Sequence, residues 1–157
     1  MTMEFEQAAA LFGDRGALLG LDLGDKTIGV ASSDPDRLVA TPVETIRRKK
    51  FTIDATRLQD LATERSVVGF ILGLPLNMDG SEGPRVQSTR AFARNLSNKI
   101  ALPIALWDER LSTAAMERDL IAIDTSRAKR AEKIDESAAT FILQGAIDRI
   151  RFLRTAP

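Results

Sequence analysis

The sequence predicts an α/β fold built on a five-stranded mixed sheet with helices on both faces. Three short apolar or β-branched runs come first, separated by turn residues, which is typical of antiparallel strands. Two further apolar runs then alternate with amphipathic segments, which is typical of parallel strands joined by helices. The 157 residues fit one domain, and 44% hydrophobic residues are enough for a buried core.

The first three strands are predicted at Leu18–Leu23, Thr27–Ser33 and Val43–Ile46. The turn Gly24-Asp25-Lys26 joins the first two strands as a hairpin, and a proline precedes the third. The later elements are a helix at Thr52–Arg65, a strand at Val67–Leu74, a helix at Arg85–Ile100, a strand at Pro103–Trp107 and helices at Ser112–Ile121 and Asp135–Leu153. This order, β-β-β-α-β-α-β-α-α, is that of the ribonuclease H-like fold.

The two chain segments outside these elements are expected to be flexible. Met1–Ala17 is predicted to be an N-terminal extension with one helical turn around Gln7–Phe12, so that the folded domain spans residues 18–153. Asp124–Lys133 is predicted to be a loop. The N-terminal segment lacks a basic start before an apolar run, and no apolar run approaches the roughly 20 residues of a membrane span. We therefore expect a cytoplasmic protein.

The composition restricts the chemistry, because the chain has no cysteine and no histidine. Disulfides, zinc–thiolate sites, thiol nucleophiles and imidazole bases are excluded. Catalysis must use carboxylates, hydroxyls, amines or a bound metal, and all-oxygen ligands favour Mg²⁺ or Mn²⁺. The formal net charge is zero, which argues against non-specific binding of nucleic acid by the whole surface.

Basic residues nevertheless cluster in two runs. The first, Arg47–Lys50, is as compatible with a solvated polar connection as with a binding surface. The second contains Arg127, Lys129, Arg130 and Lys133 and comes just before an acidic residue, which favours contact with phosphate.

Asp22 is the residue whose position most favours a functional site. Strand alternation places Asp22 on one face with Gly20 and Gly24, opposite three leucines. A carboxylate inside a buried strand is costly unless it is paired or bound to a metal, and glycine neighbours leave room for a metal and a phosphate. The alternative is that Asp22 caps the turn or pairs with Lys26.

Asp108 and Glu109 directly follow the strand at Pro103–Trp107. Extended geometry directs them to opposite sides of the sheet, so only one can face Asp22, and alternation does not decide which. The simpler alternative is that Asp108 or Ser112 caps the next helix.

Asp135 shares a helical stripe with apolar residues of the last helix, which directs it toward the sheet and Asp22. The stripe contains Ala139, Ile142, Ala146, Ile150 and Leu153. The alternative is an ordinary acidic cap at a helix start. Phe141 and Phe152 lie off the stripe, so this helix has a second face for a neighbouring element or for a partner chain, as in a homodimer.

Three carboxylates brought together would repel one another unless cations lie between them. Two Mg²⁺ or Mn²⁺ ions roughly 4 Å apart can activate water and stabilise the leaving oxygen in phosphodiester hydrolysis, without a histidine. The residues therefore indicate a nuclease with a two-metal site.

Four blocks of the sequence resemble the YqgF/RuvX family, nucleases linked to pre-16S rRNA and described as Holliday-junction-resolvase-like. The blocks are Gly20–Ala31, Gly73–Glu82, Asp108–Thr113 and Asp135–Ala139. The resemblance implies a ribonuclease H-like fold and a role in maturing the 5′ end of 16S rRNA, or in resolving branched DNA. One departure is Thr27, where many relatives carry a basic residue or serine.

By position, the resemblance implies an acidic metal site of Asp22, Glu109 and Asp135, and it favours Glu109 over Asp108 as the ligand. It also implies that Asn77 and Arg110 border the nucleic acid.

Two other functions stay compatible with the sequence. Asp22-Leu23-Gly24 also resembles a phosphate-binding turn of actin-like ATPases, but those enzymes close two such domains around ATP and this chain has the length of one. A non-catalytic nucleic-acid-binding or assembly protein on the same fold would use the basic stretch Arg127–Lys133.

Overall fold

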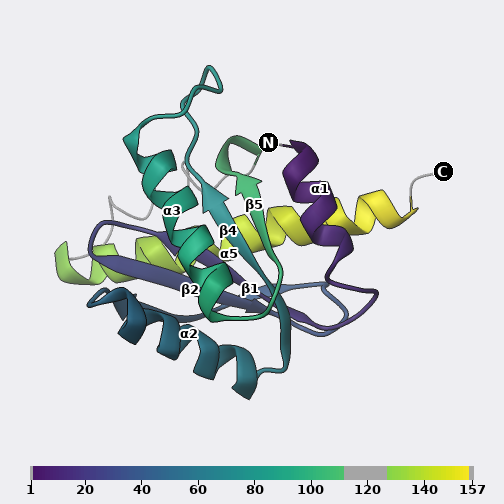
Figure 1. Cartoon of the computed structure of the whole chain (residues 1–157), viewed down its shortest axis with the longest axis horizontal. Coiled ribbons are helices and arrows are strands. Elements are labelled where there is room, and N and C mark those ends of the chain that lie inside the picture. The colour runs from purple at the N-terminus through teal and green to yellow at the C-terminus, as the bar shows by residue number, and fades with distance from the viewer. Residues whose placement is uncertain (1, 112–126, 156–157) are drawn as a thin grey trace.

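The computed structural model describes residues 2–111 and 127–155, with side chains described for residues 5–111 and 138–155 (Figure 1). One five-stranded sheet forms its centre, in the order β3-β2-β1-β4-β5. β1 is antiparallel to β2, and β2 to β3, whereas β1, β4 and β5 run parallel. The strands are β1 (Ala17–Leu23), β2 (Thr27–Ser33), β3 (Ala40–Arg47), β4 (Val67–Leu74) and β5 (Ile104–Asp108). The predicted mixed sheet is therefore confirmed.

Helices cover both faces of this sheet (Figure 1). α2 (Phe51–Glu64) and α3 (Pro84–Lys99) pack on one face, and α5 (Arg127–Thr155) crosses the other against β1, β2 and β3. A short 3₁₀ turn, η1 (Glu109–Leu111), follows β5. In the described part of the chain, no helix combines the length and apolar character that a membrane span needs.

Alternation along β1 decides which side chains meet which helices. Leu19, Leu21 and Leu23 lie in the core under α2 and α3. Gly20 lies on the opposite face, where a Cβ atom would stand 2.6 Å from the Cβ of Leu143. The backbone of α5 thus approaches β1 closely over Gly20, and Asp22, two residues further, shares that face.

The N-terminal segment is not a flexible extension. It forms α1 (Thr2–Ala10), which packs against β5, and it buries Phe5 and Phe12 in the core that α5 covers. The Phe12 ring fills the space over Gly69 of β4, a residue without a side chain. The prediction failed because the apolar stripe is short and interrupted by acidic residues, whereas the docking energy comes from these two aromatic rings.

Arg37 anchors this segment from the turn between β2 and β3. Its guanidinium donates to the carbonyl oxygens of Phe12, Gly13 and Gly16 at 2.8–2.9 Å, and the side chain is 2% exposed. Burial lowers the pKa of Arg37. These three hydrogen bonds tie the chain between α1 and β1 to the turn between β2 and β3.

α5 is longer than predicted and begins at Arg127, so the basic stretch up to Lys133 is helical and not a loop. The stretch Arg127–Lys133 consists of Ala, Lys, Arg and Glu only, and these residues favour helix. Asp135 therefore lies inside α5 and not at its start. The helix predicted at Ser112–Ile121 falls outside the described residues.

The predicted stripe of α5 is buried against the sheet at Ala139, Ile142, Ala146 and Ile150, whereas its last member, Leu153, is half-buried. Phe141 is half-buried beside that core, whereas Phe152 is 59% exposed under the guanidinium of Arg149. A homodimer through this second face stays a prediction.

Candidate acidic site

Asp22 lies near the end of β1, at the centre of the sheet, and is 4% exposed. In the antiparallel ladder between β1 and β2, it lies opposite Gly29. Because Gly20 on the same face meets α5, the Asp22 carboxylate is on the α5 side of the sheet. The buried acidic position expected from the sequence is therefore present in the fold.

Glu109 lies on the same face as Asp22. A Cβ atom at Gly73 would stand 3.2 Å from Cγ and 3.3 Å from Cδ of Glu109, so the Glu109 carboxyl group covers Gly73. Leu21 of β1 pairs with Leu72 of β4, and Asp22 and Gly73 are the next residues along these parallel strands. Adjacent strands are about 4.8 Å apart. The fold thus places the carboxyl groups of Asp22 and Glu109 over neighbouring strands.

Asp108 has different surroundings from Glu109. Trp107 pairs with Gly73 and lies in the core under α5, so the alternation of β5 puts Asp108 on the opposite side. There the Arg110 guanidinium donates to both carboxylate oxygens, the shortest contact being 2.7 Å. Burial opposes the ionisation of Asp108, but the side-chain and backbone hydrogen bonds from Arg110 outweigh it and lower the pKa of Asp108.

Arg110 also connects η1 to the loop between β4 and α3. Its Nη1 donates to the carbonyl oxygen of Met78 at 3.2 Å, close to Gly80, whose φ of +87° favours glycine. Asn77 stabilises this loop through two internal hydrogen bonds. Its side-chain amide donates to the Ser81 hydroxyl, and its backbone N–H donates to the Ser81 carbonyl oxygen. The loop therefore lies beside the turn that carries Glu109.

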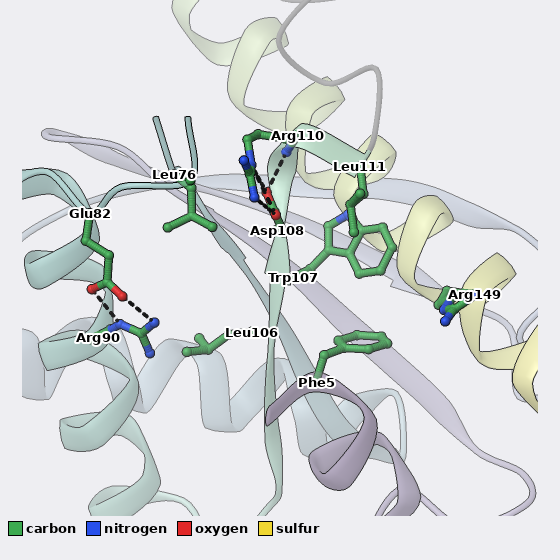
Figure 2. Close-up of a pocket in the computed structure, with 11 residues that line it drawn as sticks. Phe5, Leu76, Glu82, Arg90, Leu106, Trp107, Asp108, Arg110, Leu111 and Arg149 are labelled. Atoms are coloured by element: carbon green, nitrogen blue, oxygen red, sulfur yellow. Dashed lines mark hydrogen bonds and ion pairs between the residues drawn. The ribbon is translucent and has the colours of Figure 1, made fainter. Parts of the chain in front are cut away.

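A cavity of about 210 Å³ opens at the edge of β5, between α1, η1 and this loop (Figure 2). Phe5 and Trp107 form its apolar wall, with ring centroids 5.0 Å apart in an edge-to-face arrangement. Two ion pairs border it, Arg110 with Asp108 and Arg90 with Glu82. Neither Asp22 nor Glu109 lines this cavity, so it is separate from the acidic face.

Asp135 is in α5, one turn before Ala139, but its side chain lies outside the described residues, as do those of Arg127, Lys129, Arg130 and Lys133. Among described side chains, no three carboxylates group closely enough to hold a metal ion. The ligand set of Asp22, Glu109 and Asp135 therefore stays a prediction.

The donor set of the acidic face fits Mg²⁺ or Mn²⁺. Asp22 and Glu109 supply carboxylate oxygens only, and the chain contains no histidine or cysteine that could favour a softer metal. Gly73 is the position that sequence reasoning missed. Its signal is a glycine near the end of a buried strand, which marks the close approach of another group, here the Glu109 side chain.

Comparison with known proteins identifies the family. A family model described as RuvX, Holliday junction resolvase, matches residues 16–149. A protein of Rhodopseudomonas palustris named "Putative pre-16S rRNA nuclease" is 73% identical over 150 residues, which are 96% of this chain and 94% of the relative. A protein of the same name from Bradyrhizobium diazoefficiens is 71% identical over 148 residues, 94% of this chain and 92% of the relative.

Solved structures share the fold. RuvC of T. thermophilus, in complex with a Holliday junction substrate, aligns with a TM-score of 0.56 at 11% identity and covers 89% of this chain and 96% of its own. The yeast mitochondrial Holliday junction resolvase aligns with a TM-score of 0.53 at 12% identity, and the alignment covers 88% of this chain and 80% of the resolvase. The fold is ribonuclease H-like. Together with the sequence matches over nearly the whole chain, this shows that the protein belongs to the RuvX family.

Proposed function

We propose that this protein is a metal-dependent nuclease that hydrolyses phosphodiester bonds, and that it acts in the cytoplasm on the 5′ end of pre-16S rRNA. The observation that carries the proposal is the placement of Asp22 and Glu109 over neighbouring strands, on one face of the sheet. Two carboxylates this close favour a bound cation, and oxygen-only donors favour Mg²⁺ or Mn²⁺.

Asp22, Glu109 and Asp135 are the residues that would hold the metal ions. Bound there, two such ions would supply an activated water and charge stabilisation for the leaving oxygen. The protein's own part is positioning. Gly20 lets the backbone of α5 approach β1, and Gly73 lets the Glu109 side chain lie against β4. The positions of the acidic side chains are therefore set by closely packed helices and strands.

Asp108 and Arg110 act through Glu109 in this proposal. The Arg110 backbone N–H and guanidinium both bond to the Asp108 carboxylate and close the η1 turn, in which Glu109 is the first residue. Arg110 is then a positioning residue whose guanidinium is already committed to Asp108 and to the Met78 carbonyl oxygen. Direct contact between Arg110 or Asn77 and the nucleic acid stays a prediction.

RNA is the favoured substrate because the relatives that match over nearly the whole chain, at 73% and 71% identity, carry a pre-16S rRNA nuclease name. Branched DNA is the second candidate, because the family model is described as a Holliday junction resolvase. Both substrates present the same phosphodiester chemistry, so one site serves either.

The test is cleavage of a precursor 16S rRNA fragment and of a four-way DNA junction by the purified protein with Mn²⁺. Asp22→Asn should abolish cleavage while the thermal unfolding curve shows a folded protein. Asp60→Asn, an isosteric change on an exposed position of α2, is the matched control and should cleave like the wild type. Unchanged cleavage by Asp22→Asn would refute the assigned site. Binding of either substrate without cleavage by the wild type would favour the non-catalytic alternative.

A further inference from the structure

We infer that a basic surface around the β1–β2 turn binds the phosphate backbone of the nucleic acid next to the acidic face. This surface, the turn cations, consists of Lys26, Arg48, Lys49, Lys50 and Arg85. It lies where β1 ends, where β3 leads into α2 and where α3 begins. The inference rests on the proposed function, because it specifies how the substrate of that site is held.

Two of the turn cations are fixed to the backbone that follows Asp22. Arg48 donates from Nη1 to the carbonyl oxygen of Gly24 at 2.6 Å, and its backbone N–H donates to the carbonyl oxygen of Lys26 at 2.8 Å. Arg85 donates from Nη2 to the carbonyl oxygen of Leu23 at 3.4 Å. The two guanidinium groups therefore lie against residues one and two positions after the acidic residue.

This anchoring leaves donors for a ligand. The Arg48 guanidinium carbon is 5.8 Å from the centroid of the Phe92 ring, so the group is supported from one side. A guanidinium has five N–H donors in a planar fork that matches phosphate oxygens, and one hydrogen bond to a carbonyl uses one of them. Because the side chain is already ordered, binding a phosphate costs less conformational entropy.

The turn cations are all exposed, and little negative charge offsets them. Asp25 lies on the same turn. Asp54 is nearby but is 2% exposed, and its carboxylate accepts the backbone N–H of Lys49 at 3.1 and 3.2 Å. The net charge of the whole chain is zero, so this positive surface is local, and it sits at the end of the sheet where Asp22 lies.

Two helix starts add to the positive field. α2 begins after Lys50, whose side chain makes no capping hydrogen bond, and α3 begins after Gly83 with Pro84 as its first residue. The first backbone N–H groups of a helix carry partial positive charge and favour anions. A phosphate chain lying across this end of the sheet would meet the turn cations on one side of β1 and the acidic face on the other.

The experiment compares two double variants that each remove two positive charges, one just before the start of α2 and the other at the far ends of α2 and α3. Lys49→Ala/Lys50→Ala removes two turn cations that make no side-chain hydrogen bond in the described residues. Arg65→Ala/Lys99→Ala removes two exposed cations at the far ends of the same helices. Affinity is measured by fluorescence anisotropy for a labelled 20-nucleotide RNA and a 20-base-pair DNA duplex, at several salt concentrations and without divalent metal.

We expect Lys49→Ala/Lys50→Ala to weaken RNA binding roughly 10- to 30-fold at 0.1 M salt and to reduce the slope of log K against log salt by about 1.4, since each phosphate contact contributes about 0.7 for a single strand. Arg65→Ala/Lys99→Ala should change neither the affinity for RNA nor the salt dependence of binding. If Lys49→Ala/Lys50→Ala loses affinity for both the RNA and the DNA probe, the result supports recognition of the phosphate backbone that the two share. If it loses affinity for the RNA alone, the result supports phosphate recognition for the RNA substrate. Equal effects of the two variants, or no effect of either, would overturn the inference.

The binding comparison separates this inference from the proposed function. If Asp22→Asn still cleaves, the assigned acidic site fails, while the difference between the two double variants still decides the role of the turn cations. If Asp22→Asn is inactive and the variants bind alike, the nuclease assignment stands and the turn cations are a solvated polar connection.

Discussion

Arg110 closes a turn on Asp108. The Arg110 backbone N–H donates to Oδ1 of Asp108 at 3.0 Å, and its guanidinium donates to both carboxylate oxygens at 2.7–3.1 Å. Glu109 lies between these two residues and has its carboxyl group over Gly73 on the other side of the sheet. The ion pair thus determines the backbone from which Glu109 projects, although neither partner faces Asp22.

Replacing Arg110 by alanine should lower metal-dependent cleavage about 10- to 100-fold, because small displacements of a catalytic group have effects of this size. The loss should appear mainly in kcat and in the Mn²⁺ concentration needed for half-maximal activity, with KM for nucleic acid changed less. Arg110→Lys should recover only part of the activity, since lysine cannot make the bidentate contact.

Arg15→Ala is the control for Arg110→Ala, because it breaks an exposed ion pair with Asp36 far from η1. Its cleavage and metal dependence should equal those of the wild type. A large rise in KM with unchanged kcat in Arg110→Ala would contradict the positioning role and indicate direct contact with the substrate.

Gly73→Ala should reduce activity more than stability. The added methyl group would stand 2.6 Å from Cδ1 of Ile142, the end of a flexible side chain, and 3.2 Å from Cγ of Glu109. Both side chains can rotate away, but Glu109 then leaves the position beside Asp22. Cleavage rates and thermal melts of the same preparation measure the two effects.

Gly20→Ala, unlike Gly73→Ala, should reduce stability more than activity. Its methyl group would meet the Cβ of Leu143 at 2.6 Å and the carbonyl oxygen of Ala139 at 3.0 Å, which are parts of α5 that cannot rotate away. Overpacking of this kind costs about 1–3 kcal/mol of unfolding free energy. Urea denaturation should show this loss, and a Gly20→Ala protein as stable as the wild type would mean that α5 does not approach β1 as described.

Phe12→Ala should destabilise the protein by about 3 kcal/mol, because the ring is 2% exposed and fills the space over Gly69. Leu11→Ala is the matched control, since Leu11 is the preceding residue and is 72% exposed. It should change the urea midpoint little. Equal midpoints for both variants would indicate that the N-terminal segment does not dock in solution.

The Glu44–Arg57 pair, which joins β3 to α2, should make a small pH-dependent contribution to stability. Hydrogen bonds from Arg57, at 2.6 and 3.0 Å, lower the pKa of Glu44. A lowered carboxyl pKa means that the stabilisation is present above the pKa of the unfolded glutamate and is lost as the pH falls through the lower folded value. Because both side chains are partly exposed, it amounts to no more than about 1 kcal/mol.

Urea denaturation of wild type and Glu44→Gln between pH 7 and pH 3 measures this contribution. The stability difference should be largest at pH 7 and shrink in acid. The variants Arg57→Gln and Glu44→Gln/Arg57→Gln complete the double-mutant cycle, and the stability difference between these two should show no such trend from the pair. A difference that is constant across this range would show that the pair does not favour the ionised glutamate.

Strand positions could be predicted because β1 and β4 are continuous buried runs bounded by glycine or proline, and the face of Asp22 followed from the period of two along a strand. The choice between Asp108 and Glu109 could not be made in this way. It depends on the pairing of Trp107 with Gly73, a contact between residues that are distant in the chain.

Local sequence patterns also did not predict where α1 and α5 begin and end. Phe5 in α1 and Phe12 just after it became decisive only because β5 presents Trp107 to the first and β4 presents Gly69 to the second. By itself the sequence determined the order of the elements, the oxygen-only chemistry and the burial of Asp22, since composition and periodicity are local properties. Only the tertiary structure decided that Asp22 and Glu109 lie over neighbouring strands and that Arg48 and Arg85 bind the backbone that follows Asp22. The physical reason is that strand register and helix docking depend on contacts between distant segments.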